Sequence, residues 1–398
     1  MDASAQPRPR LPAGIWVLGF VSLLMDVSSE LIHSLLPVFM VTTLGTTVLV
    51  VGLIEGAAEA TALMVKVFSG VLSDYWGRRK PLAVLGYGLG AVSKPLFALA
   101  TTSGLVLSAR LIDRVGKGIR GAPRDALIAD IVPPAIRGAA FGLRQALDTV
   151  GAFLGPLLAI GLMLLWANDF RAVFWVAVIP GFLSVALLVI AVREPPRPTG
   201  GHPGNPVRPE NLRRLSPAYW WVVGVGAVFT LARFSEAFLV LRAQQGGLAM
   251  AWTPLVLIAM NLVYSIGAYP FGKLADKMSH RALLAWGLAV LIAADLLLAA
   301  SAAGPLLWCG IALWGLHMAM TQGLLSAMVA LAAPADLRGT AFGFFNLLSG
   351  LALLLASGLA GLLWDRWGAP VTFLAGSVFS AAALAVLALR PREQARTP

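Results

Sequence analysis

The sequence has few charged residues and a single cysteine. Asp, Glu, Lys and Arg make up 12% of its 398 residues, whereas soluble domains contain about 25%. So apolar a chain is typical of a membrane protein and not of a soluble domain. Cys309 has no second cysteine to pair with, which excludes a disulfide framework and a metal cluster built on several cysteines within one chain.

The sequence motifs of common enzymes are also missing. There is no Gly-rich phosphate loop and no Gly-x-Ser-x-Gly nucleophile elbow, and no soluble domain is present to bind a nucleotide. We therefore expect no enzymatic activity, no cofactor and no transport driven directly by ATP.

Long apolar segments fill the rest of the chain, in which 58% of residues are hydrophobic. Segments of about 20 residues are long enough to cross a hydrocarbon core of roughly 30 Å. The sequence predicts an all-α membrane protein with twelve transmembrane helices, at about residues 15–41, 48–72, 81–101, 104–130, 138–165, 171–192, 218–243, 252–274, 281–302, 305–332, 338–363 and 368–389.

The net charge of +11 is distributed unevenly along the chain. With a cytoplasmic N-terminus, eighteen Lys and Arg residues fall on the cytoplasmic side and three in outer loops. Cytoplasmic loops of membrane proteins carry this excess of basic residues. We expect a multi-pass protein of the inner (plasma) membrane with both termini in the cytoplasm, and the basic charge then requires no nucleic acid partner.

Two short motifs occur twice. Gly70, Leu72, Asp74 and Arg79 recur 202 residues later as Gly272, Leu274, Asp276 and Arg281. Similarly, Arg137, Gly138, Phe141 and Gly142 recur 201 residues later as Arg338, Gly339, Phe342 and Gly343. The chain is therefore predicted to be two pseudo-symmetric six-helix halves, residues 1–192 and 218–398, joined by a Pro-rich cytoplasmic linker at 193–217. Parallel repeats of this kind occur in secondary transporters.

Three motifs resemble those of the major facilitator superfamily. "GVLSDYWGRRK" at residues 70–80 resembles the family's loop signature, Arg114 followed by "VGKG" resembles its helix 4 arginine motif, and "GAFLGPLLAIG" at 151–161 resembles the Gly-Pro motif associated with antiporters. The resemblance implies the twelve-helix fold of that family and transport by alternating access. It also implies that the first, fourth, seventh and tenth helices line the transport cavity.

Charges follow one face of the segment at 104–130. At 3.6 residues per turn they occupy an arc of about 140°; they are Arg110, Asp113, Arg114, Lys117, Arg120, Arg124 and Asp125. A charge at the bilayer centre costs about 2.5–3.5 kcal/mol on insertion scales, so this face must contact protein or water.

Similar polar faces on other segments complete the candidate site. The residues expected to line a substrate and proton cavity are Asp26, Glu30, His33, Arg110, Arg114, Arg144, Asp148, Arg233, Glu236, His317 and Gln322. The residues expected to form gating contacts are Asp74, Arg78, Arg79, Lys80, Arg120, Arg124, Arg137, Asp276 and Arg338. Pairing is the alternative role, because nine basic and nine acidic residues inside the segments balance one another.

The function expected is secondary active transport of a small solute across the lipid bilayer by a monomer. The basic residues of the segment at 104–130 favour an anionic or zwitterionic organic substrate, and Glu30 beside His33 is the preferred proton carrier. Three alternatives stay open: a divalent metal or metal-chelate transporter using Asp26, Glu30, His33 and His317, a broad drug efflux pump, and a membrane scaffold or receptor. Neither the substrate nor the direction of transport follows from the sequence.

Overall fold

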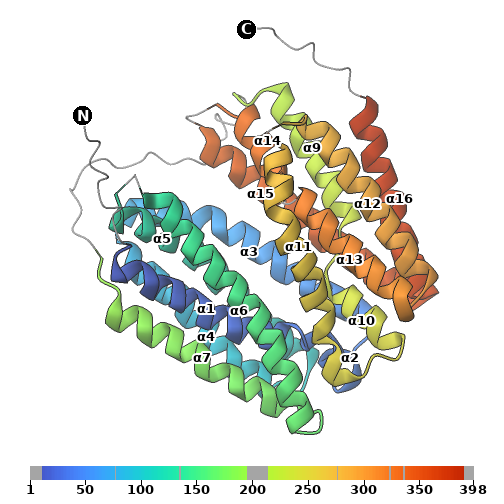
Figure 1. The fold of residues 1–398 in the computed structure, drawn as a ribbon, viewed down its shortest axis with the longest axis horizontal. Helices are drawn as coiled ribbons and strands as arrows, with labels where there is room; N and C mark the ends of the chain where they lie inside the picture. Colours follow the sequence, from blue (N-terminus) through green and yellow to red (C-terminus); the bar gives the residue numbers. More distant parts are fainter. Residues whose placement is uncertain are drawn as a thin grey trace, which may run out of the picture.

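The computed structural model describes residues 11–76, 78–133, 136–194, 214–275, 277–321, 324–334 and 337–389. Every regular element in these ranges is helical (Figure 1). The elements are α1 (Ala13–His33), α2 (Leu36–Thr42), α3 (Val48–Trp76), α4 (Arg79–Ala98), α5 (Ser103–Ile131), α6 (Arg137–Leu165), α7 (Phe170–Ala191), α9 (Pro217–Ala232), α10 (Ala237–Gln245), η2 (Met250–Trp252), α11 (Pro254–Ala275), α12 (His280–Ala300), α13 (Gly304–Thr321), α14 (Leu324–Ala332), α15 (Arg338–Trp367) and α16 (Ala369–Leu389).

Each of the twelve predicted segments falls on one α-helix or on two consecutive ones. Nine helical stretches of the described chain are long and apolar enough to cross a membrane. The other three predicted segments correspond to α4, α5 and the pair α13 and α14. The all-helical membrane fold is therefore confirmed, and the count of twelve crossings stays a prediction.

Two of the apolar segments are interrupted. α1 ends at His33 and α2 begins at Leu36, because Pro37 at the start of α2 has no N–H to continue the hydrogen bonds of α1. α9 ends at Ala232 and α10 begins at Ala237, with Arg233 in an extended conformation at φ −116° and ψ 90°. Interrupted helices form the binding sites of many transporters, since the break frees polar groups toward the interior.

The helices form two groups, α1–α7 and α9–α16, that pack chiefly within themselves (Figure 1). Contacts between the groups run mainly along α3 and α15, with smaller ones between α6 and α11 and between α2 and α10. The division agrees with the duplication in the sequence. Its boundary at 193–217 stays a prediction, because residues 195–213 lie outside the described ranges.

The contact between α3 and α15 requires small residues and ends in a polar cap. A Cβ atom placed on Gly361 of α15 would lie 2.6 Å from Cα of Leu49 in α3, too close for any side chain. One turn further along α15, the Asp365 carboxylate accepts hydrogen bonds from the backbone N–H groups of Val48 at 3.0 Å and Leu49 at 2.8 Å. A side chain of one group therefore caps the first helical turn of a helix in the other.

Candidate functional site

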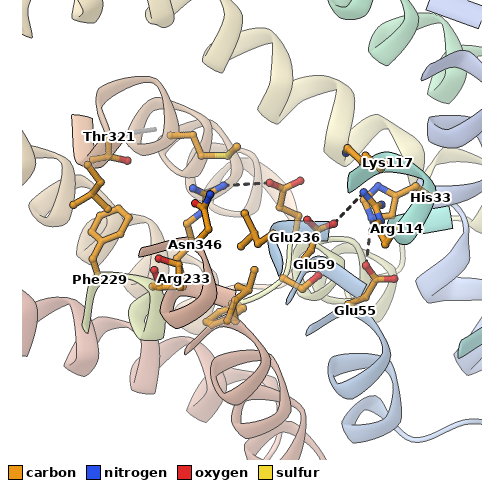
Figure 2. Close-up of a pocket in the computed structure, with 18 of the residues that line it drawn as sticks. His33, Glu55, Glu59, Arg114, Lys117, Phe229, Arg233, Glu236, Thr321 and Asn346 are labelled. Carbon is orange, nitrogen blue, oxygen red and sulfur yellow. Dashed lines mark ion pairs between the residues drawn. The ribbon is translucent and has the colours of Figure 1, made fainter. Parts of the chain in front are cut away.

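A cavity of about 530 Å³ lies between the two groups of helices (Figure 2). Both groups contribute charged side chains to its wall: Glu30, His33, Glu55, Glu59, Arg114 and Lys117 from one, and Arg233 and Glu236 from the other. The remaining lining is a mixture of apolar residues, hydroxyl groups and the two amides of Asn261 and Asn346. A cavity with this lining can hold a small solute that carries charge.

Two ion pairs connect α3 to α5, one turn apart on each helix. Arg110 Nε donates to Glu55 Oε1 at 3.0 Å, and its Nη2 pairs with the other oxygen of the same carboxylate. Arg114 Nη1 lies 3.2 Å from Glu59 Oε1. The side chains of the first pair are only 3% and 1% exposed, whereas Glu59 is 36% exposed. The first pair therefore holds the helices together, whereas the second is open to a solute at Glu59, with Arg114 itself only 4% exposed.

His33 lies between two carboxylates at the end of α1. Its Nδ1 is 3.4 Å from Glu30 Oε2, and its Nε2 is 3.4 Å from Glu55 Oε2. Polar side chains thus form a continuous chain from Arg110 through Glu55 and His33 to Glu30, whose side chain is 23% exposed. An imidazole placed between two carboxylates can pass a proton from one to the other.

The other group of helices provides an ion pair at the break between α9 and α10. Arg233 Nη2 lies 3.6 Å from Glu236 Oε1, and both side chains are about one quarter exposed. Figure 2 shows this pair on the opposite side of the cavity from His33 and Glu55. The cavity thus has an arginine and a carboxylate on each of two facing walls.

Five of the predicted cavity residues line the cavity: Glu30, His33, Arg114, Arg233 and Glu236. Arg110 differs from the expectation, because Glu55 holds it inside the protein between α3 and α5. Asp26 lies one turn before Glu30 on α1 and is half-buried, but it does not belong to the cavity wall. Gln322 lies outside the described residues.

Arg144 and Asp148 also differ from the expectation, since they form a separate ionic cluster between α5 and α6. Arg144 Nη1 is 3.0 Å from Asp148 Oδ2 and 3.6 Å from Asp125 Oδ1. Arg124 Nε donates to Asp125 Oδ1 at 3.1 Å, and its Nη1 donates to Ser22 Oγ of α1 at 3.0 Å. Mutual pairing, the alternative that the charge balance allowed, accounts for these four charges.

His317 lies behind the cavity wall and does not line it. The side chain is fully buried, and its Nδ1–H donates to the carbonyl oxygen of Gly287 at 2.8 Å. Its ring stacks on Phe229, which does line the cavity, with 5.4 Å between ring centroids. This histidine therefore joins α13 to α12 and does not reach a solute in this conformation.

The predicted gating residues are dispersed. Arg79 Nη1 pairs with Asp130 Oδ2 at 3.0 Å, and Lys80 Nζ donates to the Val189 carbonyl at 2.8 Å. Arg120 lies over the Tyr87 ring at 4.9 Å, a cation–π contact. Two side chains, Arg78 and Arg137, are exposed, Arg124 belongs to the cluster between α5 and α6, and the side chains of Asp74, Asp276 and Arg338 lie outside the described part of the chain.

Five charged or amide residues of the cavity were not among the predicted site: Glu55, Glu59, Lys117, Asn261 and Asn346. The first two are four residues apart in the helix at 48–76, and Lys117 belongs to the charged face of α5, so helical spacing could have found these three. The two asparagines are isolated polar residues in apolar helices. Only their position in the folded bundle identifies them.

The candidate metal site is not supported by the geometry. Within the described ranges no group of three or more His, Cys, Asp or Glu side chains is arranged to hold a metal ion. His33 is bonded to Glu30 and Glu55, Asp26 is not part of the wall, and His317 is buried behind Phe229.

Comparison with known proteins assigns the family. The family model of the Major Facilitator Superfamily matches residues 18–356 and 247–398. An uncharacterized MFS-type transporter of Methanocaldococcus jannaschii is 34% identical over 377 residues, which is 93% of each chain. The multidrug resistance protein MdtH of Photorhabdus laumondii is 30% identical over 162 residues, 41% of this chain and 39% of that one.

A solved structure shows the same fold. It is a bacterial homolog of the human lysosomal transporter Spinster in an inward-facing, occupied conformation, 16% identical in sequence, with a TM-score of 0.78 over 96% of this chain and 97% of that chain. The arrangement of helices is the one expected for the family that the family model and the full-length relative indicate. This chain belongs to the major facilitator superfamily of membrane transporters.

Proposed function

We propose that this transporter moves a small organic solute bearing an anionic group, with a zwitterion as the preferred class, by proton-coupled alternating access. The observation that carries the proposal is the pair of facing walls, Arg114 with Glu59 and Arg233 with Glu236. A guanidinium has five donors and binds a carboxylate through two of them. The facing carboxylates would balance an ammonium group on the same solute.

Both arginines lie in ion pairs whose carboxylates are open to the cavity. Arg114 pairs through Nη1 with Glu59, which is 36% exposed, and Arg233 reaches Glu236 only at 3.6 Å. The two arginines belong to different groups of helices, so a solute that binds both must bridge the two halves. A solute that bridges the halves binds more tightly to an occluded state than to an open one, and alternating access requires such a difference in affinity.

Solute counterflow in proteoliposomes tests the substrate class. A panel of labelled organic acids, amino acids and amines should show exchange for acids or zwitterions. Losing a charge-assisted contact costs about 1.5–3 kcal/mol, so Arg114→Ala should weaken binding by about 10–100-fold, and Arg114→Lys should restore only part of it. Arg171→Ala is the control, because that guanidinium contacts the Ala100 carbonyl outside the cavity. Exchange of amines alone, unaffected by Arg114→Ala, would contradict the proposal.

Proton coupling is assigned to Glu30 and His33. Glu30 is the exposed end of a chain that continues through His33 to the buried Glu55, so a proton taken from the cavity can be shared with the imidazole. Glu30→Gln should abolish accumulation driven by a pH gradient while leaving counterflow exchange intact. Retained accumulation in Glu30→Gln would assign the proton to another group, whereas loss of exchange as well would assign Glu30 to solute binding.

Drug efflux is the second candidate, supported by the partial match to the multidrug resistance protein MdtH. The Gly-Pro segment of α6 packs tightly on α1, where a Cβ atom on Gly151 would lie 2.8 Å from the Leu23 carbonyl oxygen. Transport of apolar cationic dyes in the same vesicles, insensitive to Arg114→Ala, would favour this function over the first.

The last part of the proposed function is the orientation of the chain in the membrane. The eighteen-to-three distribution of basic residues supports cytoplasmic termini, and we propose that the transporter works as a monomer in the inner membrane. Maleimide labelling from outside and inside of sealed vesicles checks it, with Ala249→Cys in a Cys309→Ser background, because Ala249 is exposed between α10 and η2. Labelling from the outer face only is expected.

A further inference from the structure

A buried carboxylate, Asp295, lies outside the cavity in the second group of helices, α9–α16. Asp295 of α12 is 0% exposed, and neither of its oxygens has a hydrogen-bond partner among the described residues. Its Oδ2 would lie 2.6 Å from a Cβ atom on Gly376 of α16, and Phe234 would lie 3.1 Å from the same Cβ. Phe234 also forms part of the cavity wall, so Asp295 lies directly behind that wall.

The pseudo-symmetry of the fold shows what this position holds in the first half. Gly86 of α4 packs against Arg120 of α5, and Gly287 of α12 packs against Thr321 of α13. The members of these two contacts are related by the same shift of 201 residues. The helix pair α12 and α13 is therefore the structural counterpart of α4 and α5.

The same shift relates Asp295 to Lys94, and Trp314 to Asp113. In the first half, Lys94 and Asp113 form a fully buried ion pair, with Nζ 2.7 Å from Oδ1, and Lys94 also donates to Ser29 Oγ at 3.0 Å. In that pair each charge lies beside an opposite charge. The second half has an acid in place of the lysine and an indole in place of the aspartate, so the acid has no cation beside it.

Among the described residues of the elements packed on Asp295, no charged group pairs with it. The titratable residues of α13 are Cys309, which is exposed, and His317, which is bonded to Gly287 two turns before Asp295 on α12; the described residues of α14 and α16 contain none. Arg242 of α10 donates to the carbonyls of Leu298 and Ala299. On the cavity side, Arg233 and Glu236 pair with each other. An ionised carboxylate left alone in such a site costs several kcal/mol, so the neutral acid is the stable form.

We propose that Asp295 is a proton-binding site of the second half, protonated and closed in this conformation. Binding forms an O–H bond on one carboxylate oxygen and consumes one proton from water, and release returns it. A proton needs one oxygen, whereas hard metal cations need about six. Trp314, whose buried Nε1 has no partner among the described residues, packs on the same Phe234 ring with 5.3 Å between centroids.

The role of the site in transport rests on the proposed function. Phe234 directly follows Arg233, so a solute that moves the Arg233–Glu236 pair also moves the ring that covers Asp295. Opening of this cover would let the acid exchange its proton with the cavity. The second half would then carry a proton independently of Glu30.

Infrared difference spectroscopy of the purified transporter tests the site without any substrate. A protonated carboxylic acid has a C=O stretch separate from that of a carboxylate. Wild type at mildly acidic pH should show a band that is lost in Asp295→Asn, kept in the surface control Asp169→Asn, and reduced on raising the pH. A spectrum of Asp295→Asn identical to that of wild type would overturn the proposal, as would a band that does not change at any pH where the protein stays folded.

Thermal unfolding and the response of the infrared band to sodium are two further tests of the site. Asn mimics the neutral acid in shape, so Asp295→Asn should unfold at the same temperature as wild type. A marked loss of stability would show an ionised, partnered carboxylate and overturn the proposal. A band that responds to sodium at constant pH would identify a sodium site instead. None of these outcomes depends on the solute, so failure here is distinct from failure of the proposed function.

Discussion

Glu55 and Glu59 provide a matched test of which charges hold the fold and which serve transport. They lie one turn apart on α3, and each pairs with an arginine one turn apart on α5. They differ in burial, since Glu55 is 1% exposed and Glu59 is 36% exposed. We predict that Glu55→Gln is strongly destabilising and that Glu59→Gln impairs transport with little effect on stability.

The magnitudes follow from the partners left behind. Glu55→Gln leaves the Arg110 guanidinium, 3% exposed, without an opposite charge, and breaking a buried pair in this way costs about 3–5 kcal/mol. Glu59→Gln leaves Arg114, which is 4% exposed, with Asp113 Oδ2 still 3.7 Å from its Nε, so an opposite charge remains beside it. A pair whose carboxylate is open to solvent is worth about 0.2–1 kcal/mol. The expected difference between the two variants is therefore about 3 kcal/mol, or roughly 4 °C in unfolding temperature for 398 residues at about 2.1 cal/mol/K per residue.

Thermal unfolding of the purified proteins in detergent, followed by tryptophan fluorescence, measures this difference. The double variant Glu55→Gln with Arg110→Gln removes both charges and should recover part of the lost stability, because no uncompensated charge is left. Counterflow of solute by Glu59→Gln in liposomes measures the effect of that substitution on transport. Equal unfolding temperatures for the two single variants would refute the assignment of Glu55 as structural.

Two further predictions concern the contact between the halves. Asp365→Ala removes the acceptor for two N–H groups of α3, so it should lower stability by about 1 kcal/mol and also slow or bias alternating access. Asp169→Ala removes a cap within one half and should lower only the unfolding temperature. Equal transport rates for the two variants would contradict the predicted effect of Asp365→Ala on alternating access. Gly361→Leu should prevent close packing against Leu49 and abolish transport, whereas Gly161→Leu, where no atom lies within 4 Å of the added Cβ, should be tolerated in thermal unfolding and in counterflow.

Much of the fold follows from local properties of the chain. Apolar segments of membrane-crossing length, the two repeated motifs and the distribution of basic residues indicated a two-half helical transporter, and the helix bounds agree within a few residues. The breaks between α1 and α2 and at Arg233 were not predicted. Hydropathy averages over a whole segment, so a short interruption inside it leaves little trace.

Helical spacing also identified the faces that carry charge, because residues four apart lie on one side of any helix. It could not say which face meets which. Asp148 and Arg144 satisfy the same spacing rule as Glu30 and His33, yet they bind Arg124 and Asp125 and lie away from the cavity wall.

The sequence by itself thus determined the class of protein, the helices and the stripe of charges on α5. Only the tertiary structure decided the role of each charge. Arg110 and Arg114 are one turn apart on the same stripe, but the approach of α3 buries the first with Glu55 and leaves the second at the cavity. Likewise Asp295 is one polar residue in an apolar segment until the packing of α16 and Phe234 shows that it has no partner. Such pairing depends on contacts between residues far apart in the chain, and local periodicity does not encode which helices meet.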